Sequence, residues 1–87
     1  MGVELVHVGF DNFVAINRIV AITSVKSTSI RRAMQDSKDR GLLIDVTHGK
    51  KTKTVIFTDS RHVFVVARAP EVIAGRLQTN RVESDAE

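Results

Sequence analysis

A short basic segment, residues 47–54, carries the side chains best suited to chemistry in this 87-residue sequence. It contains Lys50, Lys51 and Lys53 and no acidic residue. Phosphate groups are bound by cationic donors that reach out from a supported backbone, and neighbouring threonine hydroxyls can add neutral donors. If the segment forms the tip of a two-stranded hairpin, that hairpin also has the width to enter the major groove of DNA. The segment therefore predicts either a nucleic-acid contact or, since lysine is common on surfaces, a solvated turn.

Three arginines elsewhere are further candidates for contacts with nucleic acid. Arg31 and Arg32 fall in a predicted helix that mixes cations with two aspartates, a pattern typical of a solvated face with internal ion pairs. Arg18 stands as a lone cation between two apolar stretches. Its position predicts either a residue that keeps an edge strand from pairing with another chain or a phosphate-binding arginine.

The sequence offers little for catalysis. Its histidines are His7, His48 and His62, and it has no cysteine, which excludes disulfides and thiolate chemistry. Asp45 precedes His48 by three residues, but one such pair without an acidic cluster or a glycine-rich phosphate loop is weak support for an active site. No histidine spacing fits a metal site. We therefore expect a protein that is not an enzyme and that uses no metal, cofactor or small-molecule ligand.

The placement of aromatic residues bears on which nucleic acid would be bound. The chain has four phenylalanines, no tyrosine and no tryptophan, and none of the phenylalanines lies in residues 47–54. Proteins that bind single strands stack the bases on aromatic side chains. Because the basic segment has no such ring, the pattern favours contact with the backbone of a duplex over contact with single strands.

The charge distribution agrees with a polyanionic partner. The whole chain carries 13 Lys and Arg against 10 Asp and Glu, a net charge of +3. Residues 79–87 hold three acidic residues and one arginine, so residues 1–78 keep 12 cations against 7 anions, a net charge of +5. We predict a basic domain at 3–78 and an acidic disordered tail at 79–87. No apolar stretch approaches the roughly 20 residues of a membrane span and no secretory signal is visible, so we expect a cytoplasmic protein without membrane contact.

Alternating apolar stretches and turn residues predict a single α+β domain. Ser27 supplies an N-cap hydroxyl, Gly41 fits a left-handed C-cap, and Pro70 suits a first helical position. Because the predicted turns, among them His48-Gly49, are short, we expect a small, mainly antiparallel sheet in which residues 47–54 form the tip of a hairpin. The expected helices are 28–40 and 70–78, and the expected strands are Val3–Val8, Phe13–Ile16, Ile19–Val25, Leu42–Thr47, Thr52–Thr58 and His62–Ala67.

Two of the predicted strands, Leu42–Thr47 and His62–Ala67, carry aliphatic side chains on both faces. Strands of this kind are buried on both faces. Two short helices would hardly cover both sides of a sheet, and a chain of this length has only a small core of its own. We therefore expect a homo-oligomer, in which further copies cover the remaining apolar surface.

Several short motifs occur in order along residues 3–78, and the run from Leu43 to Val55 is the most specific of them. They are Asn17-Arg18-Ile19, Gln35-Asp36, Gly41 with Leu43-Ile44-Asp45, Thr47-x-Gly49-Lys50-Lys51-Thr52-Lys53, Asp59-Ser60-x-His62-Val63, and Pro70-Glu71 with Arg76-Leu77. Together they resemble the RemA family, the extracellular matrix regulatory protein A group of small bacterial proteins.

The resemblance implies a DNA-binding transcriptional regulator that activates biofilm-matrix genes and assembles into ring-shaped homo-oligomers. It further implies that DNA contacts Arg18, Lys50 and Lys51, with Lys53 also in the pattern, at positions repeated around the ring. The family typically has two arginines where this chain has Lys50-Lys51, and lysine keeps the charge but loses the bidentate fork. The competing expectations are an oligomeric adaptor for protein partners, whose basic segment is only solvated, and a binder of double-stranded RNA.

Overall fold

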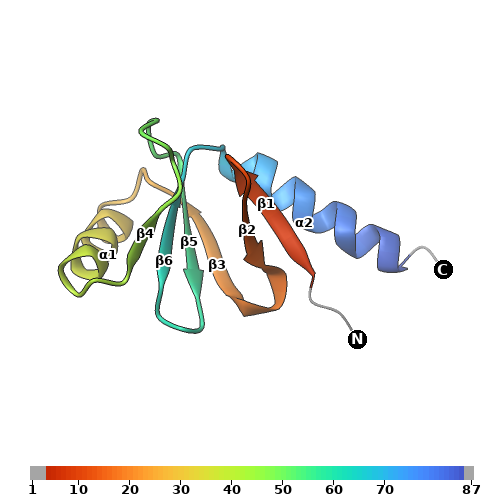
Figure 1. Cartoon of the computed structure of the whole chain (residues 1–87), viewed down its shortest axis with the longest axis horizontal. Coiled ribbons are helices and arrows are strands. Elements are labelled where there is room, and N and C mark those ends of the chain that lie inside the picture. Colours follow the sequence, from red (N-terminus) through yellow and green to blue (C-terminus); the bar gives the residue numbers. More distant parts are fainter. Residues whose placement is uncertain (1–3, 86–87) are drawn as a thin grey trace.

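Short strands form the centre of the protein and two helices flank them (Figure 1). The computed structural model describes the backbone of residues 4–85 and the side chains of residues 4–78. The α+β class predicted from the sequence is confirmed. The elements in this part of the chain are β1 (Leu5–Gly9), β2 (Asn12–Ala15), the 3-10 turn η1 (Ile16–Arg18), β3 (Ile19–Ser24), α1 (Thr28–Asp39), β4 (Leu43–Asp45), β5 (Thr54–Thr58), β6 (Val63–Val66) and α2 (Pro70–Asp85).

The strands form two separate sheets. β1 and β2 make an antiparallel pair, and the other four strands are ordered β3-β5-β6-β4. β5 pairs antiparallel with both β3 and β6, whereas β4 runs parallel to β6. The pairing is thus mainly antiparallel, as predicted, with one parallel pair at the edge of the larger sheet.

The hairpin predicted around residues 47–54 is wrong. β4 and β5 do not pair, because β6 lies between them. The local turn is nevertheless present, since His48 and Gly49 both have positive φ (57° and 82°) and the Lys50 N–H donates to the Thr47 carbonyl oxygen at 3.0 Å. This turn belongs to a loop, residues 46–53, that crosses the end of β6. The basic segment is therefore a crossing loop and not a two-stranded ribbon.

Side chains of the larger sheet alternate between two apolar clusters, one on each face. α1 covers one face, where Ile30 and Met34 pack against a cluster that contains Val63. On the opposite face Val66 lies in a cluster with buried residues of β1, β2 and α2, among them Ile73. Both faces of β6 are thus covered from within the chain. The sequence argument for a second copy counted only the helices and missed the β1–β2 pair, so burial of β6 does not by itself require assembly.

Helix α1 has the ends that its sequence predicts. At its start the Ser27 hydroxyl accepts a hydrogen bond from the Ser29 N–H at 3.2 Å. At its end Gly41 has a φ of 74°, and the Leu42 N–H donates to the Ser37 carbonyl oxygen at 2.8 Å. This bond satisfies a helix-terminal carbonyl that would otherwise lack a partner and turns the chain into β4.

Helix α2 begins at Pro70 as predicted but runs to Asp85, so the predicted end near Gln78 was wrong. Pro70 fits the first helical turn, and the acidic Glu71 beside it suits the positive end of the helix dipole. The predicted disordered tail, residues 79–87, falls on positions whose side chains, and for 86–87 also the backbone, lie outside the described residues.

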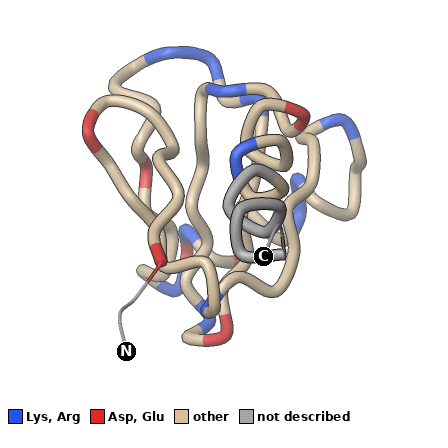
Figure 2. The backbone as a smooth tube through the Cα atoms, turned by 90° about the vertical axis from the view of Figure 1, so that its right-hand side faces the viewer, with Lys and Arg blue, Asp and Glu red and all other residues tan. Residues whose placement is uncertain are grey.

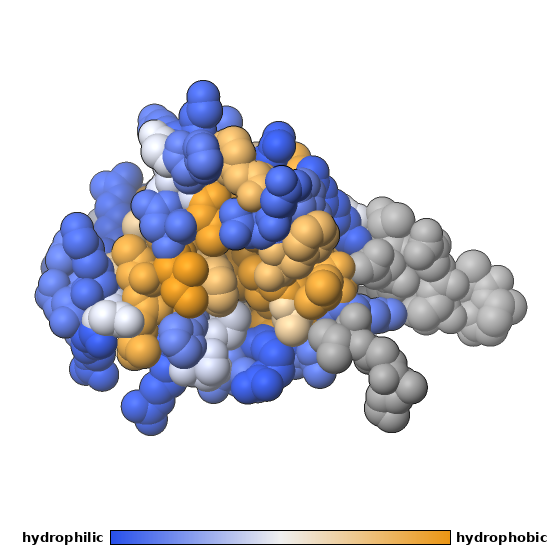
Figure 3. All heavy atoms as spheres, in the orientation of Figure 1, coloured by the Kyte–Doolittle hydropathy of each residue, from blue (hydrophilic) through white to orange (hydrophobic). Residues whose placement is uncertain are grey.

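Several large apolar side chains stay exposed although the core is closed. Leu5 is 51% exposed, Phe13 56% and Val20 69%. Leu5 and Phe13 lie on the outer face of the β1–β2 pair, because their neighbours Val6 and Val14 point into the core. Figure 3 shows hydrophobic side chains gathered in a band across the middle of one face of the molecule, with hydrophilic side chains above and below. The fold therefore leaves apolar surface outside the core.

Candidate nucleic-acid interface

The loop of residues 46–53 is held at both ends by β6. The Val46 N–H donates to the carbonyl oxygen of Val65 at 3.1 Å, and the Lys53 N–H donates to that of Val66 at 2.9 Å. Between these two anchors the tip of the loop is exposed. The lysines therefore extend from a backbone that is tied to the sheet on both sides, as a phosphate contact requires.

An Asp–Thr contact orders the start of this loop. The Asp45 carboxylate accepts hydrogen bonds from the Thr47 hydroxyl at 2.6 Å and from the Thr47 N–H at 2.8 Å. Because both bonds stabilise the charged form, the hydroxyl first and the amide second, the pKa of Asp45 is lowered below its ordinary value. Asp45 thus engages Thr47, while His48 stacks on Phe10. The Asp–His pair considered for catalysis is not formed.

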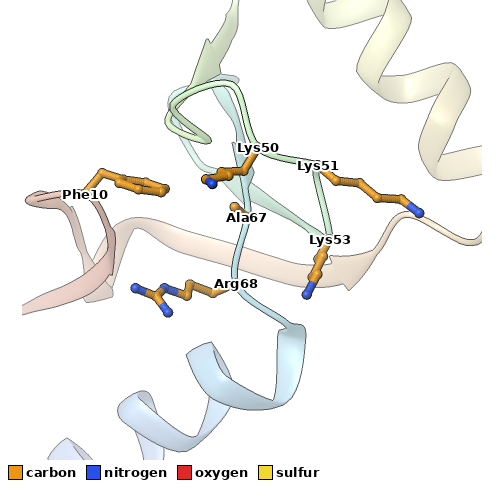
Figure 4. A pocket seen from close by; sticks show the side chains of 6 residues that line it. All are labelled: Phe10, Lys50, Lys51, Lys53, Ala67 and Arg68. Carbon is orange, nitrogen blue, oxygen red and sulfur yellow. The ribbon is translucent and has the colours of Figure 1, made fainter.

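Four cationic side chains line a hollow of about 340 Å³ beside the loop (Figure 4). Lys50, Lys51 and Lys53 come from the loop, and Arg68 comes from the segment between β6 and α2. In Figure 4 Lys50 points across the hollow toward Phe10, Arg68 extends below them, and Lys51 points to the opposite side. The three lysines therefore do not form a single cluster, because they serve two neighbouring surfaces.

A second hollow, of about 450 Å³, adjoins the first and shares Lys51 and Lys53 with it. Lys26 and Arg31 also line this hollow, and the first turn of α2 contributes Glu71. We call the surface formed by the two hollows the basic end. Its cations are Lys26, Arg31, Lys50, Lys51, Lys53 and Arg68.

The cations of the basic end form no ion pair with a described carboxylate. Among the side chains of residues 4–78, the ion pairs are Arg18 with Asp59 and Arg40 with Asp36. Arg31 donates from Nε to a backbone carbonyl oxygen at 2.9 Å, which orients its side chain without neutralising it. Figure 2 shows Lys and Arg positions gathered along the upper loops, with fewer acidic positions among them. A surface of uncompensated like charge attracts anions.

Two of the predicted contacts, Arg18 and Arg32, lie outside the basic end. Arg18 is not the lone cation that the sequence suggested, because its Nε donates to Asp59 Oδ1 at 2.7 Å. Arg18 lies just before β3, beside the end of β5, whereas Lys53 lies just before the start of β5. The length of β5, about 13 Å at the usual rise per residue, therefore separates Arg18 from Lys53. Arg32 is exposed on α1 and lines neither hollow. Of the predicted arginines, only Arg31 joins the lysines.

Lys26 and two residues of the first hollow, Phe10 and Arg68, were missed from the sequence. Phe10 lies 40 positions before Lys50, in the β1–β2 turn, and is 40% exposed. Its ring is stacked on His48, with 5.0 Å between the ring centroids. Residues 47–54 themselves contain no aromatic ring, but the fold brings Phe10 beside the lysines. No local pattern marks Phe10 or Arg68, because their proximity follows from the path of the loop across β6.

Histidine and acidic residues form no candidate metal site in the described part of the chain, where no three such side chains gather. His7 packs against Phe13 with 5.0 Å between ring centroids, and His62 Nδ1 lies 2.9 Å from Ser60 Oγ. Each histidine thus has a local structural contact. Among the helices described, none combines the length and the apolar content needed to cross a membrane.

Comparison with known proteins finds one family and several bacterial relatives. Residues 5–77 match the RemA-like family, described as extracellular matrix regulatory protein A-like. A protein of Dehalococcoides mccartyi is 53% identical over 81 residues, which cover 93% of this chain and 84% of the relative. A protein of Clostridium kluyveri is 47% identical over 85 residues (98% and 92%), and one of Clostridium botulinum is 51% identical over 79 residues (91% and 89%). All three are named as candidate regulatory proteins.

Proposed function

Because the chain belongs to the RemA-like family of bacterial regulatory proteins, we propose that it is a transcriptional regulator that binds double-stranded DNA through the basic end. Control of biofilm-matrix genes and a place in the bacterial cytoplasm are parts of the same proposal. The family is a regulatory one, and the proposal assigns no catalytic step to the chain.

The charge of the basic end is the observation that carries this proposal. Among the side chains of residues 4–78, six cations line the two hollows, and Glu71 is the one carboxylate that does so. Duplex DNA presents one negative charge per about 1.7 Å of its axis, so donors spread over both hollows can contact several phosphates. Such contacts position a protein on DNA without reading its sequence. Lysine at positions 50 and 51 favours this mode over bidentate recognition of a base.

Self-association is the second part of the proposal. Leu5, Phe13 and Val20 remain exposed around a closed core, and contact between copies would cover them. A single chain with six cations binds DNA weakly at cellular salt, whereas linked copies gain affinity through effective concentration. A ring of copies, as the family resemblance implies, would repeat the basic end at regular intervals along bound DNA.

Arg18 enters the proposal only through assembly. In one chain it is held by Asp59 and lies at the far end of β5 from Lys53. In an oligomer that far end can lie beside the basic end of the next copy, which brings Arg18 to the same DNA. Arg18→Ala should then lower duplex affinity and leave the free energy of unfolding within about 1 kcal/mol, because a half-exposed ion pair contributes little. Unchanged duplex affinity would leave Arg18 with a structural role only, the ion pair with Asp59 that joins η1 to the β5–β6 turn.

Titration of a fluorescent DNA duplex, followed by anisotropy at several salt concentrations, tests the proposal. We expect binding that weakens steeply as salt rises, because it comes from phosphate contacts. A duplex RNA of the same sequence serves as the comparison. Absence of DNA binding even at about 50 mM salt would leave the adaptor for protein partners as the function. Tighter binding to the RNA duplex would favour the RNA binder.

A further inference from the structure

The ring of Phe10 carries neither a charge nor an N–H or O–H donor with which to bind a phosphate. Phe10 and Asp11 both adopt a left-handed backbone, with φ of 52° and 63°, which is uncommon for bulky residues. The Asn12 side-chain amide donates to the carbonyl oxygens of Gly9 and Phe10, at 3.1 Å in each case, and so holds this turn. The turn thereby keeps a partly exposed aromatic ring at the edge of a cationic hollow.

His48 and two cations surround this ring. The imidazole of His48 lies nearly parallel to the Phe10 ring, with 19° between the planes. In Figure 4 Lys50 and Phe10 point toward one another above the small side chain of Ala67, and Arg68 extends along the other side of the hollow. An aromatic face and two positive charges therefore border the same space.

The backbone of Arg68 is held by a hydrogen bond, and its side chain lies close to the turn that carries Phe10. The buried Thr54 hydroxyl donates to the Arg68 carbonyl oxygen at 2.6 Å. A Cβ added to Gly9 would lie 3.5 Å from Nε of Arg68, so the arginine side chain lies directly against the backbone of the β1–β2 turn. The backbone of Arg68 is therefore held in place, and its side chain lies beside the β1–β2 turn.

From this arrangement we propose that the hollow at Phe10 binds a nucleotide, with its base stacked on Phe10 and its phosphate held by Lys50 and Arg68. The volume of about 340 Å³ lies at the lower end of the usual range for small-molecule sites, about 300–1,000 Å³. Stacking on an aromatic ring accepts any base and contributes roughly 5- to 150-fold in affinity per base. A free nucleotide and an unpaired nucleotide of a strand share this chemistry.

This inference rests on the proposed function, because Lys50 belongs to both sites. A nucleotide at Phe10 neutralises Lys50 and Arg68 and removes two cations from the surface offered to duplex DNA. Bound nucleotide and bound duplex therefore compete. The site gives the proposed regulator a means to respond to nucleotides or to unpaired DNA.

Phe10→Trp provides a direct test, since the chain has no tryptophan and no tyrosine. Adenosine monophosphate should quench the fluorescence of this variant saturably, and Lys50→Ala with Arg68→Ala in the same chain should weaken that binding by about tenfold or more. Phe13→Trp is the matched control, because Phe13 is also an exposed phenylalanine beside a histidine but lies outside the hollow. Adenosine and inorganic phosphate, titrated separately, should each bind more weakly than the nucleotide.

A short single-stranded oligonucleotide distinguishes the two sources of the ligand. Tighter binding of the oligonucleotide than of adenosine monophosphate identifies an unpaired strand, and the reverse identifies a free nucleotide. Phe10→Leu, which keeps an apolar side chain without the ring, should lose about fivefold or more in nucleotide affinity. Duplex binding is measured separately, by the titration of the unsubstituted chain, so failure of this inference and failure of duplex binding are distinguished.

Nuclear magnetic resonance on the unsubstituted chain makes the test independent of how the variants fold. Adenosine monophosphate should shift the amide resonances of Gly9 to Asn12 and of Arg68. Equal quenching of the two tryptophan variants, together with unchanged resonances in the unsubstituted chain, would overturn the proposal.

Discussion

Replacement of Lys50 and Lys51 by alanine should reduce DNA affinity far more than stability. Both side chains are exposed, and neither pairs with a described carboxylate, so the free energy of unfolding should change by no more than about 0.5 kcal/mol. Each engaged phosphate contact contributes about −0.9 to the slope of log K against log salt concentration. With all six cations of the basic end engaged, the slope per chain is about −5.4, and affinity falls roughly 1,800-fold between about 50 and 200 mM salt.

The double variant keeps four of these cations, so we expect a slope of about −3.6 and a loss of roughly 150-fold over the same salt range. In an assembly this loss of contacts repeats at every engaged copy. Duplex binding at physiological salt should then disappear while the mass of the assembly is unchanged. Anisotropy of a labelled duplex at several salt concentrations measures both slopes, and light scattering measures the mass.

Lys38→Ala combined with Arg40→Ala is the matched control. It also removes two cations, but from the C-terminal end of α1, which leads into the start of β4 and not into the loop. Its slope and affinity should stay close to those of the parent. A Lys50/Lys51 variant that binds with the parent's affinity and slope would refute the reasoning and show that the loop is only solvated.

Asp45, the exposed apolar side chains and the acidic segment each give a further test. Asp45→Ala removes both hydrogen bonds that Thr47 donates to the carboxylate. Because the pKa of Asp45 is lowered in the folded protein, the stabilisation from these bonds is complete above the unfolded pKa of about 3.9 and is lost as pH falls through the folded pKa. Thermal melts of parent and variant should therefore differ at neutral pH and converge in acid. Light scattering after gel filtration should give several times the chain mass of 9.6 kDa, and Leu5→Lys with Phe13→Lys should lower it; a clean parent monomer would contradict assembly. Deletion of residues 79–87, which removes three acidic residues and one arginine, should leave the melting temperature nearly unchanged and duplex affinity equal or slightly higher, whereas loss of the oligomer would show that this segment packs.

Local patterns predicted the elements better than their pairing. Ser27, Gly41 and Pro70 act through contacts with their own neighbours, and α1 and the start of α2 were predicted correctly. The pairing of β4 with β6 depends instead on the burial of apolar side chains that lie far apart in the sequence. The stretch His62–Ala67 is apolar on both faces, a pattern typical of a central strand, and β6 indeed takes an inner position between β4 and β5. The turn at His48-Gly49 suggested a hairpin between β4 and β5, but a turn alone does not specify which strands pair, and β6 lies between these two.

The candidate site was predicted only where its residues are neighbours in the sequence. Lys50, Lys51 and Lys53 stand out because they are nearly contiguous. Phe10 and Arg68 reach the same surface through the β1–β2 turn and the segment after β6, and a single chain gives no pattern for such a meeting. The absence of an aromatic residue from the loop therefore said little about the aromatic content of the site.

The five lysines of the chain allow the central claim to be measured directly. Lys26, Lys50, Lys51 and Lys53 lie in the basic end, whereas Lys38 lies near the end of α1. Acetylation of the protein with and without saturating duplex DNA, read by mass spectrometry, reports the accessibility of each. The proposed interface predicts that DNA slows acetylation of the four lysines of the basic end and leaves that of Lys38 unchanged. Equal protection of Lys38, or no protection of the basic end while DNA is bound, would contradict it.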